Sequence, residues 1–273
     1  DVADSEQVEA AAAQVEARWG AIDVWVNNAM ATIFAPALQV SPEDFQRATQ
    51  VTYLGSVWGT QAALRRMMPR DRGVIVQVGS ALAYRSIPLQ SAYCGAKAAQ
   101  RGFTDSIRCE LVHERSSVRI TMVHLSAFNT PQFEWGRTTL GRRPRPMGKI
   151  FQPEIAARAV YEAAIHPRRE HWVGWPAVQA ILGTRVLPGF LDWMLGRRAV
   201  EGQQDHEPLP PHRPDNLWEP VPGEWGAHGR FDAQARSTST QVLASRHRWG
   251  VAATAAAGLA GVWLVFRSRR RTR

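Results

Sequence analysis

The stretch "GVIVQVGSALAYRSIPLQSAYCGAKAA", residues 73–99, decides the fold. It opens with a short apolar run that ends in Ser80, as expected for a strand buried on both faces of a parallel sheet. A helix then begins near residue 91. Tyr93 and Lys97 lie four residues apart in it, which places them on one helix face. The stretch therefore predicts a strand, a connection and a helix that bring three polar side chains to one end of the strand.

The same alternation runs through most of the chain. Apolar periodicity and capping residues predict helices over 5–19, 41–68, 91–114 and 153–165, with a further helical segment to about 198. Continuous apolar runs predict buried strands over 22–26, 73–80, 118–124 and 171–175. Alternating helices and strands predict an α/β fold, a doubly wound parallel sheet with helices on both faces. Ligands in such sheets bind at the carboxyl ends of the strands.

The positive charge is concentrated at the end of the chain. The formal charge is +9, but residues 246–273 hold seven arginines and no acid, so residues 1–245 carry only +2. A nucleic-acid-binding domain needs a basic face on its folded body. We therefore expect no nucleic-acid partner, unless the tail alone binds one in a salt-sensitive way.

Composition divides the chain into four segments. Residues 1–198 form the α/β body, and 199–248 are a Pro-rich extension without periodicity. Residues 249–266 carry no charge; as a helix they span about 27 Å, close to the ~30 Å of a bilayer core. Residues 267–273 are a basic tail. We expect 249–266 to form a C-terminal hydrophobic helix that crosses a membrane or lies in its interface. The alternative is an Ala-rich helix buried in the fold.

Tyr93, Lys97 and Ser80 suit proton transfer in carbonyl–alcohol chemistry. A free tyrosine has a pKa near 10 and is a poor base at neutral pH. A cation about 4 Å from its hydroxyl would favour the phenolate by roughly 4 kcal/mol, which is enough to bring the pKa to about 7. Lys97 has the reach to supply that charge, and Ser80 can hold the substrate oxygen. Such Tyr–Lys pairs also occur by chance on exposed helices, so the surrounding sequence matters.

Further motifs make the pattern specific. "DVAD" (1–4) and "VNNAM" (26–30) follow the expected ends of strands, and "SAFNTPQF" (126–133) follows another. With Ser80, Tyr93 and Lys97, they resemble the short-chain dehydrogenase/reductase family over residues 1 to about 198. The resemblance implies a Rossmann-like domain in which Asp1 and Val2 contact the adenine. It also implies that Asn28 and Ala29 lie beside the cofactor, that Thr130 binds the nicotinamide carboxamide and that Lys97 holds the ribose.

The chain also departs from that family. Thr52 stands where the family often has an asparagine that holds a proton-relay water, and Met30 replaces a glycine. The family's first strands and its glycine-rich phosphate loop have no counterpart in the sequence. We therefore expect a chain that lacks about sixty N-terminal residues of its parent, with 22–26 left as an exposed apolar edge. Weak cofactor binding would follow, because that loop cradles the pyrophosphate.

The resemblance implies an NAD(P)-dependent oxidoreductase that interconverts an alcohol and a carbonyl. Tyr93 would be the general acid/base, supported by Ser80, Lys97 and Thr52, with NAD or NADP as cofactor and no metal. We expect an apolar small-molecule substrate, a homo-oligomer, and a membrane-associated protein whose catalytic domain is cytoplasmic. The alternative is a catalytically silent, membrane-associated binding or scaffold protein on the same fold, which Thr52, Met30 and the missing loop favour.

Overall fold

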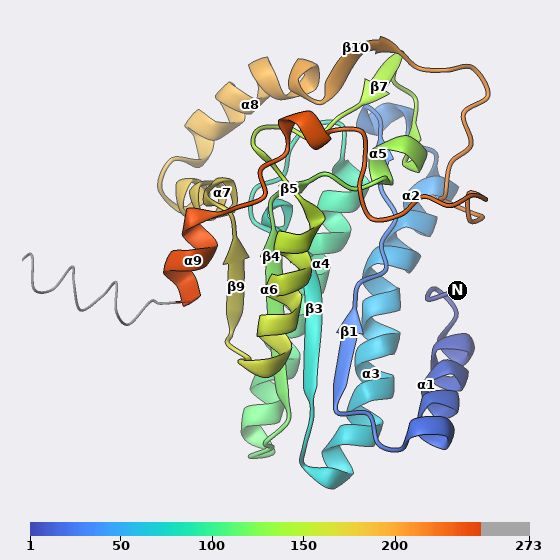
Figure 1. The fold of residues 1–273 in the computed structure, drawn as a ribbon, viewed down its shortest axis with the longest axis vertical. Coiled ribbons are helices and arrows are strands. Elements are labelled where there is room, and N and C mark those ends of the chain that lie inside the picture. Colours follow the sequence, from blue (N-terminus) through green and yellow to red (C-terminus); the bar gives the residue numbers. More distant parts are fainter. Residues whose placement is uncertain (247–273) are drawn as a thin grey trace, which may run out of the picture.

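The computed structural model describes residues 1–246, built around a four-stranded parallel sheet (Figure 1). Its order is β1 (Val24–Asn27), β3 (Val74–Ser80), β4 (Arg119–Leu125) and β9 (Glu170–Val173). The predicted parallel α/β sheet is confirmed. The register pairs Val26 with Val76 and Ser80 with Leu125, so the carboxyl ends of the strands meet at one edge of the sheet.

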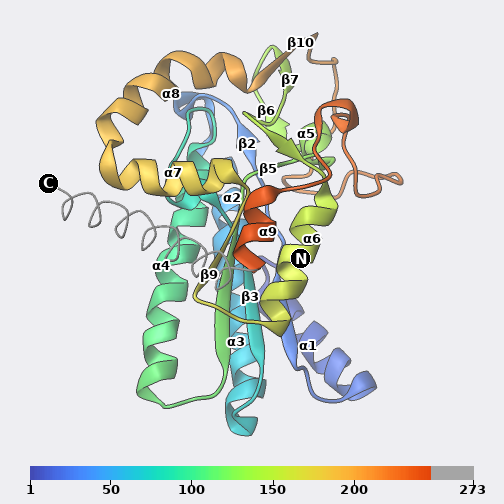
Figure 2. The same cartoon turned by 60° about the vertical axis from the view of Figure 1, so that its left-hand side comes forward.

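Helices cover the sheet from both sides, as a doubly wound fold requires. On one face α3 (Gly55–Met67) and α4 (Ser91–His113) pack against β1, β3 and β4, and α1 (Ser5–Trp19) packs on α3. On the other face α6 (Pro153–Ile165) packs against β3, β4 and β9. Figure 2 shows α4 and α6 on opposite sides of the strands. The predicted helical ranges 5–19, 91–114 and 153–165 agree with these elements.

The helix predicted over 41–68 is divided by a wide turn. It begins as α2 (Pro42–Thr49), where the side chain of Ser41 caps the first turn through the Asp44 amide. Residues Gln50–Leu54 then form a single turn of π-helix before α3. Such turns are rare inside helices and occur often at functional sites. A simple 3.6-residue period cannot predict this break.

The exposed edge of the sheet is β1. Val26 pairs with Val76, whose side chain belongs to the α6-side core, yet Val24 and Val26 remain 42% exposed. The strand is therefore not buried on both faces, as its apolar run predicted, because α6 packs mainly against β3, β4 and β9. The other expectation for this run, an exposed apolar edge, describes it correctly.

Segments that follow β4 in the chain lie over the carboxyl ends of the strands (Figure 1). They include α5 (Gln132–Trp135), α7 (Trp175–Val186) and α8 (Pro188–Gly202). The strand β7 (Arg142–Pro144) pairs antiparallel with β10 (Gln204–Pro208). Two short parallel pairs complete this layer: β2 (Ile33–Phe34) with β6 (Arg137–Thr138), and β5 (Ala127–Phe128) with β8 (Ile150–Phe151).

The Pro-rich extension packs on the body. Leu217 and Phe231 are buried, at 1% and 2% exposure, and the Nε1 atom of Trp218 donates to Asp44 over 3.1 Å. The described chain ends in α9 (Thr240–Arg246) beside β9. The hydrophobic helix predicted over 249–266 and the tail 267–273 lie outside the described residues. Within residues 1–246, none of the helices is long and apolar enough to cross a bilayer.

Candidate active site

Ser80 ends the central strand β3 at the carboxyl edge of the sheet. Its side chain is buried, and its Oγ accepts a hydrogen bond from the Leu82 amide over 3.1 Å. That bond turns the chain away from the strand. Gly79 precedes it in close contact with β4, since an added Cβ would lie 3.0–3.1 Å from Met122 and His124. The strand thus presents the hydroxyl of Ser80 at a fixed point.

Tyr93 lies in the first turn of α4 and faces Ser80. Burial raises the pKa of Tyr93 to about 12, and a hydrogen bond with the Ser80 side chain opposes that shift. Tyr93 therefore keeps its proton at neutral pH. The structure differs here from the lowered pKa that we expected from a cation at the hydroxyl. Burial dominates the pKa of Tyr93, and the Lys97 ammonium is held on the Val78 carbonyl.

Lys97 is 2% exposed, one helical turn after Tyr93. Its Nζ donates to the Val78 carbonyl over 2.6 Å and to Oε1 of Gln100 over 3.2 Å, and lies 5.8 Å from the ring centroid of Tyr93. Burial lowers the pKa of Lys97 to about 7. Desolvation thus disfavours the charged form of Lys97, and the Val78 carbonyl accepts one of the protons on its Nζ. These two contacts use two of the three protons of an ammonium group.

A buried polar network, which the sequence did not predict, holds Lys97 through Gln100. The Nε2 atom of Gln100 donates to Ser56 Oγ over 2.7 Å and to Gln77 Oε1 over 3.2 Å. Gln77 in turn accepts from Asn27 Nδ2 over 3.1 Å. Thr60 joins Asn27 and Gln77 through its hydroxyl. The only available signal was the presence of glutamines in an apolar strand and on the core face of a helix.

Thr52 lies at the centre of the π-turn and is fully buried. Its hydroxyl accepts from the Ala31 amide over 2.9 Å and donates to the Ala31 carbonyl over 3.0 Å. The hydroxyl therefore closes a loop between the π-turn and the segment after β1. Its described hydrogen bonds go to backbone, and none goes to Tyr93 or Ser80.

The residues expected to contact a cofactor occupy several places along the carboxyl edge. Asn28 and Ala29 follow β1 and are exposed to solvent. The carboxylate of Asp1 pairs with Arg47 over 2.6 Å, and Val2 packs closely on Gly55 of α3. The structure thus groups Ser80, Tyr93 and Lys97, whereas Asp1 and Val2 lie against the helices beyond β1.

Thr130 lies behind β5, where the extension covers it. A Cβ added to Gly229 would lie 2.6 Å from the Thr130 carbonyl oxygen, so the two backbones are in close contact. The amide of Phe231 donates to Asn129 Oδ1 over 2.9 Å. The extension thus fixes the loop that carries Thr130.

A second buried polar cluster stands behind Ser80. Nδ1 of His124 is 3.1 Å from the Ser80 carbonyl oxygen, and its Nε2 lies 3.6 Å from the carboxylate of Glu170. Tyr84 donates to that carboxylate over 2.6 Å and Trp172 over 2.7 Å. Although burial opposes ionisation, the His124 imidazole and these hydrogen bonds hold the pKa of Glu170 well below its usual range. Glu170 is therefore ionised, and His124 lies between its carboxylate and the backbone carbonyl of Ser80.

The residues present fit the nicotinamide half of NAD(P). Lys97 has one proton left for a ribose hydroxyl, and it stands beside Tyr93 at the strand ends where such cofactors bind. The sequence has no glycine-rich loop to hold the pyrophosphate. The fit therefore covers the reacting end of the cofactor and leaves the phosphates without a binding loop in this chain.

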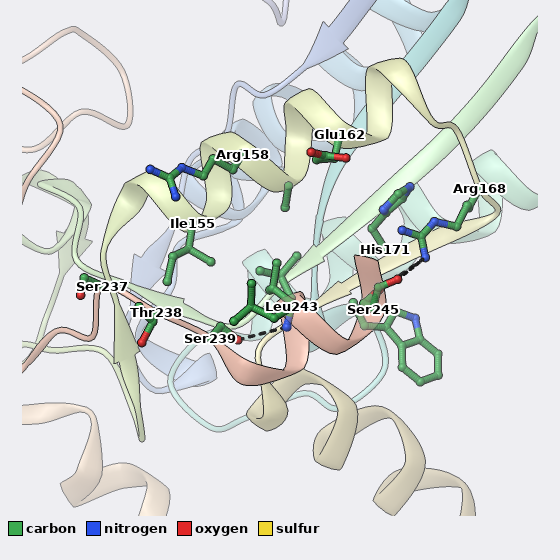
Figure 3. Close-up of a pocket in the computed structure, with 14 residues that line it drawn as sticks. Ile155, Arg158, Glu162, Arg168, His171, Ser237, Thr238, Ser239, Leu243 and Ser245 are labelled. Atoms are coloured by element: carbon green, nitrogen blue, oxygen red, sulfur yellow. Dashed lines mark hydrogen bonds between the residues drawn. The ribbon is translucent and has the colours of Figure 1, made fainter. Parts of the chain in front are cut away.

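A separate cavity of about 110 Å³ lies between α6, β9 and α9 (Figure 3). It is lined by Ile155, His171, Val242 and neighbouring residues, and Arg168 bonds to Ser245 at one end. None of its lining residues is among those predicted for the active site. It is a gap under the last described helix, away from the chemistry at Ser80.

Comparison with known proteins agrees with this geometry. A sequence model described as short chain dehydrogenase matches residues 1–139. The uncharacterized oxidoreductase YxnA of Bacillus subtilis is 32% identical over 221 residues, which cover 80% of this chain and 62% of that protein. The putative oxidoreductase SadH of Mycobacterium tuberculosis is 29% identical over 194 residues, 68% of this chain and 70% of SadH. The chain thus spans about two thirds of the length of these relatives.

Among solved structures, a short chain dehydrogenase from Burkholderia cenocepacia in complex with NADP is similar, with a TM-score of 0.60 and 26% identity over 71% of this chain and 76% of that chain. A short-chain dehydrogenase from Streptomyces avermitilis has the same fold, with a TM-score of 0.58. The family match extends over both the strand that ends in Ser80 and the helix of Tyr93 and Lys97. This chain belongs to the short-chain dehydrogenase family of oxidoreductases, whose cofactors are NAD and NADP.

Proposed function

We propose that the protein is an NAD(P)-dependent oxidoreductase that interconverts an alcohol and a carbonyl. The observation that carries the proposal is the contact between the side chains of Tyr93 and Ser80 at the carboxyl end of β3, one helical turn from Lys97. A proton donor and a second hydroxyl at one point are what a carbonyl oxygen needs. The similar NADP complex from Burkholderia cenocepacia supports the cofactor class.

The three side chains divide the chemistry between them. Tyr93, protonated at neutral pH, gives its hydroxyl proton to the carbonyl oxygen during reduction and takes it back during oxidation. Ser80 orients that oxygen by a hydrogen bond. Lys97 holds a ribose hydroxyl of the cofactor through its remaining proton, and its charge favours the tyrosinate that forms when the proton leaves. The cofactor supplies or accepts the hydride.

Thr52 and the cofactor contacts belong to the same proposal. Thr52 keeps the segment after β1 in place through Ala31, so that Asn28 and Ala29 stay at the rim of the site. Thr130, in the loop after β5, would bind the nicotinamide carboxamide. Asp1 and Val2 would contact the adenine end of the cofactor.

We extend the proposal to the setting of the protein. The substrate is an apolar alcohol or ketone, and residues 249–266 attach the protein to a membrane, with the catalytic domain in the cytoplasm and 199–248 as the connecting extension. A homo-oligomer would form through the surfaces of α3 and α4.

A silent binding protein is the second candidate. Two contacts favour it: the Lys97 ammonium is held on a strand carbonyl, and the Thr52 hydroxyl is used by backbone. In a binding protein without catalytic activity, Lys97 and Thr52 would serve only to stabilise the fold through these contacts.

A cofactor titration separates the two candidates. NADH and NADPH are added separately to the purified protein, and the fluorescence of the reduced nicotinamide is followed before and after addition of apolar ketones. If the protein is the proposed enzyme, at least one cofactor should bind weakly but saturably, because the chain has no glycine-rich loop for the pyrophosphate, and it should be oxidised when a ketone is present. Absence of saturable binding for both would favour the silent binding protein.

A further inference from the structure

The hairpin of α7 and α8 exposes an apolar surface at its bend. Leu182, Val186, Leu187, Phe190 and Trp193 are all 46–73% exposed, and we call this set the apolar elbow. Single exposed apolar residues are common on proteins, but contiguous patches mark interaction sites. The elbow is not accounted for by the active site.

The elbow is a second apolar face on helices whose first face is already buried. In α7, Ala177 and Ile181 fill the core, while Leu182 and Val186 lie on the outer side. In α8, Leu195 is buried and Phe190 stacks on Trp193 with ring centroids 5.9 Å apart. Helices that are apolar on all sides are usually buried on all sides, so a second apolar face indicates a surface that something else covers.

The charges around the elbow are positive. Residues 175–198 hold Arg185, Arg197 and Arg198, and their one acid, Asp192, is paired with Arg85. The guanidinium of Arg197 lies 4.6 Å from the ring centroid of Trp193. Exposed tryptophan and phenylalanine surrounded by arginine are typical of surfaces that lie in the interface of an anionic membrane.

The chain leads from this hairpin toward a longer apolar segment. Nε1 of Trp175, the first residue of α7, donates to Thr240 Oγ1, the first residue of α9, over 3.2 Å. Figures 1 and 2 show α9 close to one end of α7. In the sequence, the uncharged run from Trp249 to Phe266 begins three residues after α9 ends. α9 thus contacts the start of α7, the helix whose other end forms the elbow.

We propose that the apolar elbow inserts into the interface of a bilayer that contains anionic phospholipids. Its side chains would enter the boundary between headgroups and acyl chains, while the three arginines contact phosphate and carboxylate groups. A second copy of the chain fits less well, because a two-fold contact through the elbow would bring like charges together.

The position of the elbow links the membrane to the site. Arg85, five residues after Ser80, pairs with Asp192 and donates to the Pro188 carbonyl over 3.5 Å. The loop that follows Ser80 is thus joined to the elbow. If the proposed oxidoreductase function holds, a substrate dissolved in the bilayer would enter beside this loop. The lipid contact itself does not depend on that function.

A polarity-sensitive label at Gly189 tests the contact directly. Gly189 lies within the elbow, and a Cβ added there meets no atom within 4 Å, so Gly189→Cys keeps every apolar side chain. The variant also carries Cys109→Ser, because Cys109 is an exposed free thiol, whereas Cys94 is buried. The control is the unmodified chain labelled at Cys109 on α4.

With vesicles of phosphatidylcholine and phosphatidylserine, we expect a several-fold rise in the emission of the label at position 189, quenched by brominated acyl chains. The label at Cys109 should stay in water. Phe190→Ser with Trp193→Ser should abolish the rise at 189 even where the protein still sediments with the vesicles. Salt should weaken the response, and phosphatidylcholine alone should give less of it.

Three results would overturn the proposal. One is a label at 189 that stays in water when anionic vesicles are present, whether or not the protein binds to them. Another is an equal rise at 189 and at Cys109. The third is a rise that depends on protein concentration without vesicles, which would assign the elbow to self-association. None of these readouts involves turnover, so a failure here is distinct from a failure of the proposed catalysis.

Discussion

The proton chemistry of the site depends on how burial acts on two neighbouring side chains. Burial favours the neutral form of each group, so the pKa of Tyr93 rises to about 12 while that of Lys97 falls to about 7. The structure therefore holds a protonated tyrosine beside a lysine that is easily discharged. Tyr93 can therefore donate a proton in carbonyl reduction. An anion or a hydrogen-bond acceptor close to Lys97 would favour its charged form again.

The depressed pKa of Lys97 predicts a rise of stability with pH. The lysine titrates near 10.5 in the unfolded chain and near 7 in the folded one, so between these values the unfolded chain binds more protons. The free energy of unfolding should therefore increase from pH 7 to 9 by up to about 1.4 kcal/mol per pH unit, relative to Lys97→Met. Urea denaturation at several pH values measures it.

Lys149→Met is the matched control, because Lys149 is the other lysine of the chain and is exposed. Its difference from the unmodified protein should not change with pH. A Lys97→Met difference that is equally flat would show that Lys97 is not desolvated in the folded protein.

At the scale of elements, residue patterns predicted most of the core. The ranges 73–80, 91–114, 118–124 and 153–165 appear as β3, α4, β4 and α6, because strong apolar periodicity is satisfied by packing against one sheet. The burial of β1 was predicted wrongly, since a local apolar run does not tell which neighbours cover it. The site residues Ser80, Tyr93 and Lys97 come together as their spacing predicted.

Other features needed the three-dimensional structure. The network of Gln77 and Gln100 joins residues from β3 and α4 that share no sequence motif. The direction of the Lys97 side chain depends on competition between the Val78 carbonyl and the tyrosine, which spacing cannot decide. In the π-turn, Thr52 is bonded to Ala31, a residue 21 positions earlier, and no local pattern predicts that contact.

The π-turn predicts a specific need for the hydroxyl of Thr52. Thr52→Val keeps the shape but leaves the buried amide and carbonyl of Ala31 without partners. The free energy of unfolding should fall by about 1–3 kcal/mol, whereas Thr52→Ser should retain most of it. Urea denaturation compares the two. Equal stability of the Val and Ser variants would contradict the role assigned to this hydroxyl.

The outer edge of β9 makes a second prediction for an element. Gln241 of α9 accepts from the Gly174 amide over 2.7 Å and donates to the Trp172 carbonyl over 2.9 Å, as a neighbouring strand would. Gln241→Leu should speed the hydrogen exchange of the Gly174 amide by at least tenfold. Gln241→Glu, which still accepts from that amide, should preserve its protection. If the exchange rate is the same in all three proteins, α9 does not cap this edge.

At the scale of the whole molecule, the extension after α8 is part of the folded body. Its side chains fill gaps over the carboxyl ends of the strands, with Leu217 packed among Ala31 and Ala92. The same extension fixes the loop of Thr130 through contacts made by Gly229 and Phe231. The composition of 199–248 suggested a stiff linker, and only its tryptophans indicated that it could dock.

Leu217 tests how firmly the extension is held. Leu217→Ala removes a buried side chain and should lower the free energy of unfolding by about 2–5 kcal/mol. It should also speed proteolytic cleavage within 209–229. Leu38→Ala, at a fully exposed leucine, is the control and should change neither. Unchanged cleavage and stability in Leu217→Ala would mean that the extension is not anchored there.

The most direct test of the whole account is the turnover of Tyr93→Phe. The rate of NADH or NADPH oxidation with an apolar ketone is measured for the unmodified protein, for Tyr93→Phe and for Tyr161→Phe, whose tyrosine is exposed on α6. We expect kcat to fall by about 100- to 10,000-fold in Tyr93→Phe, with cofactor binding retained, and turnover to be normal in Tyr161→Phe. Turnover of Tyr93→Phe at the rate of the unmodified protein would contradict it.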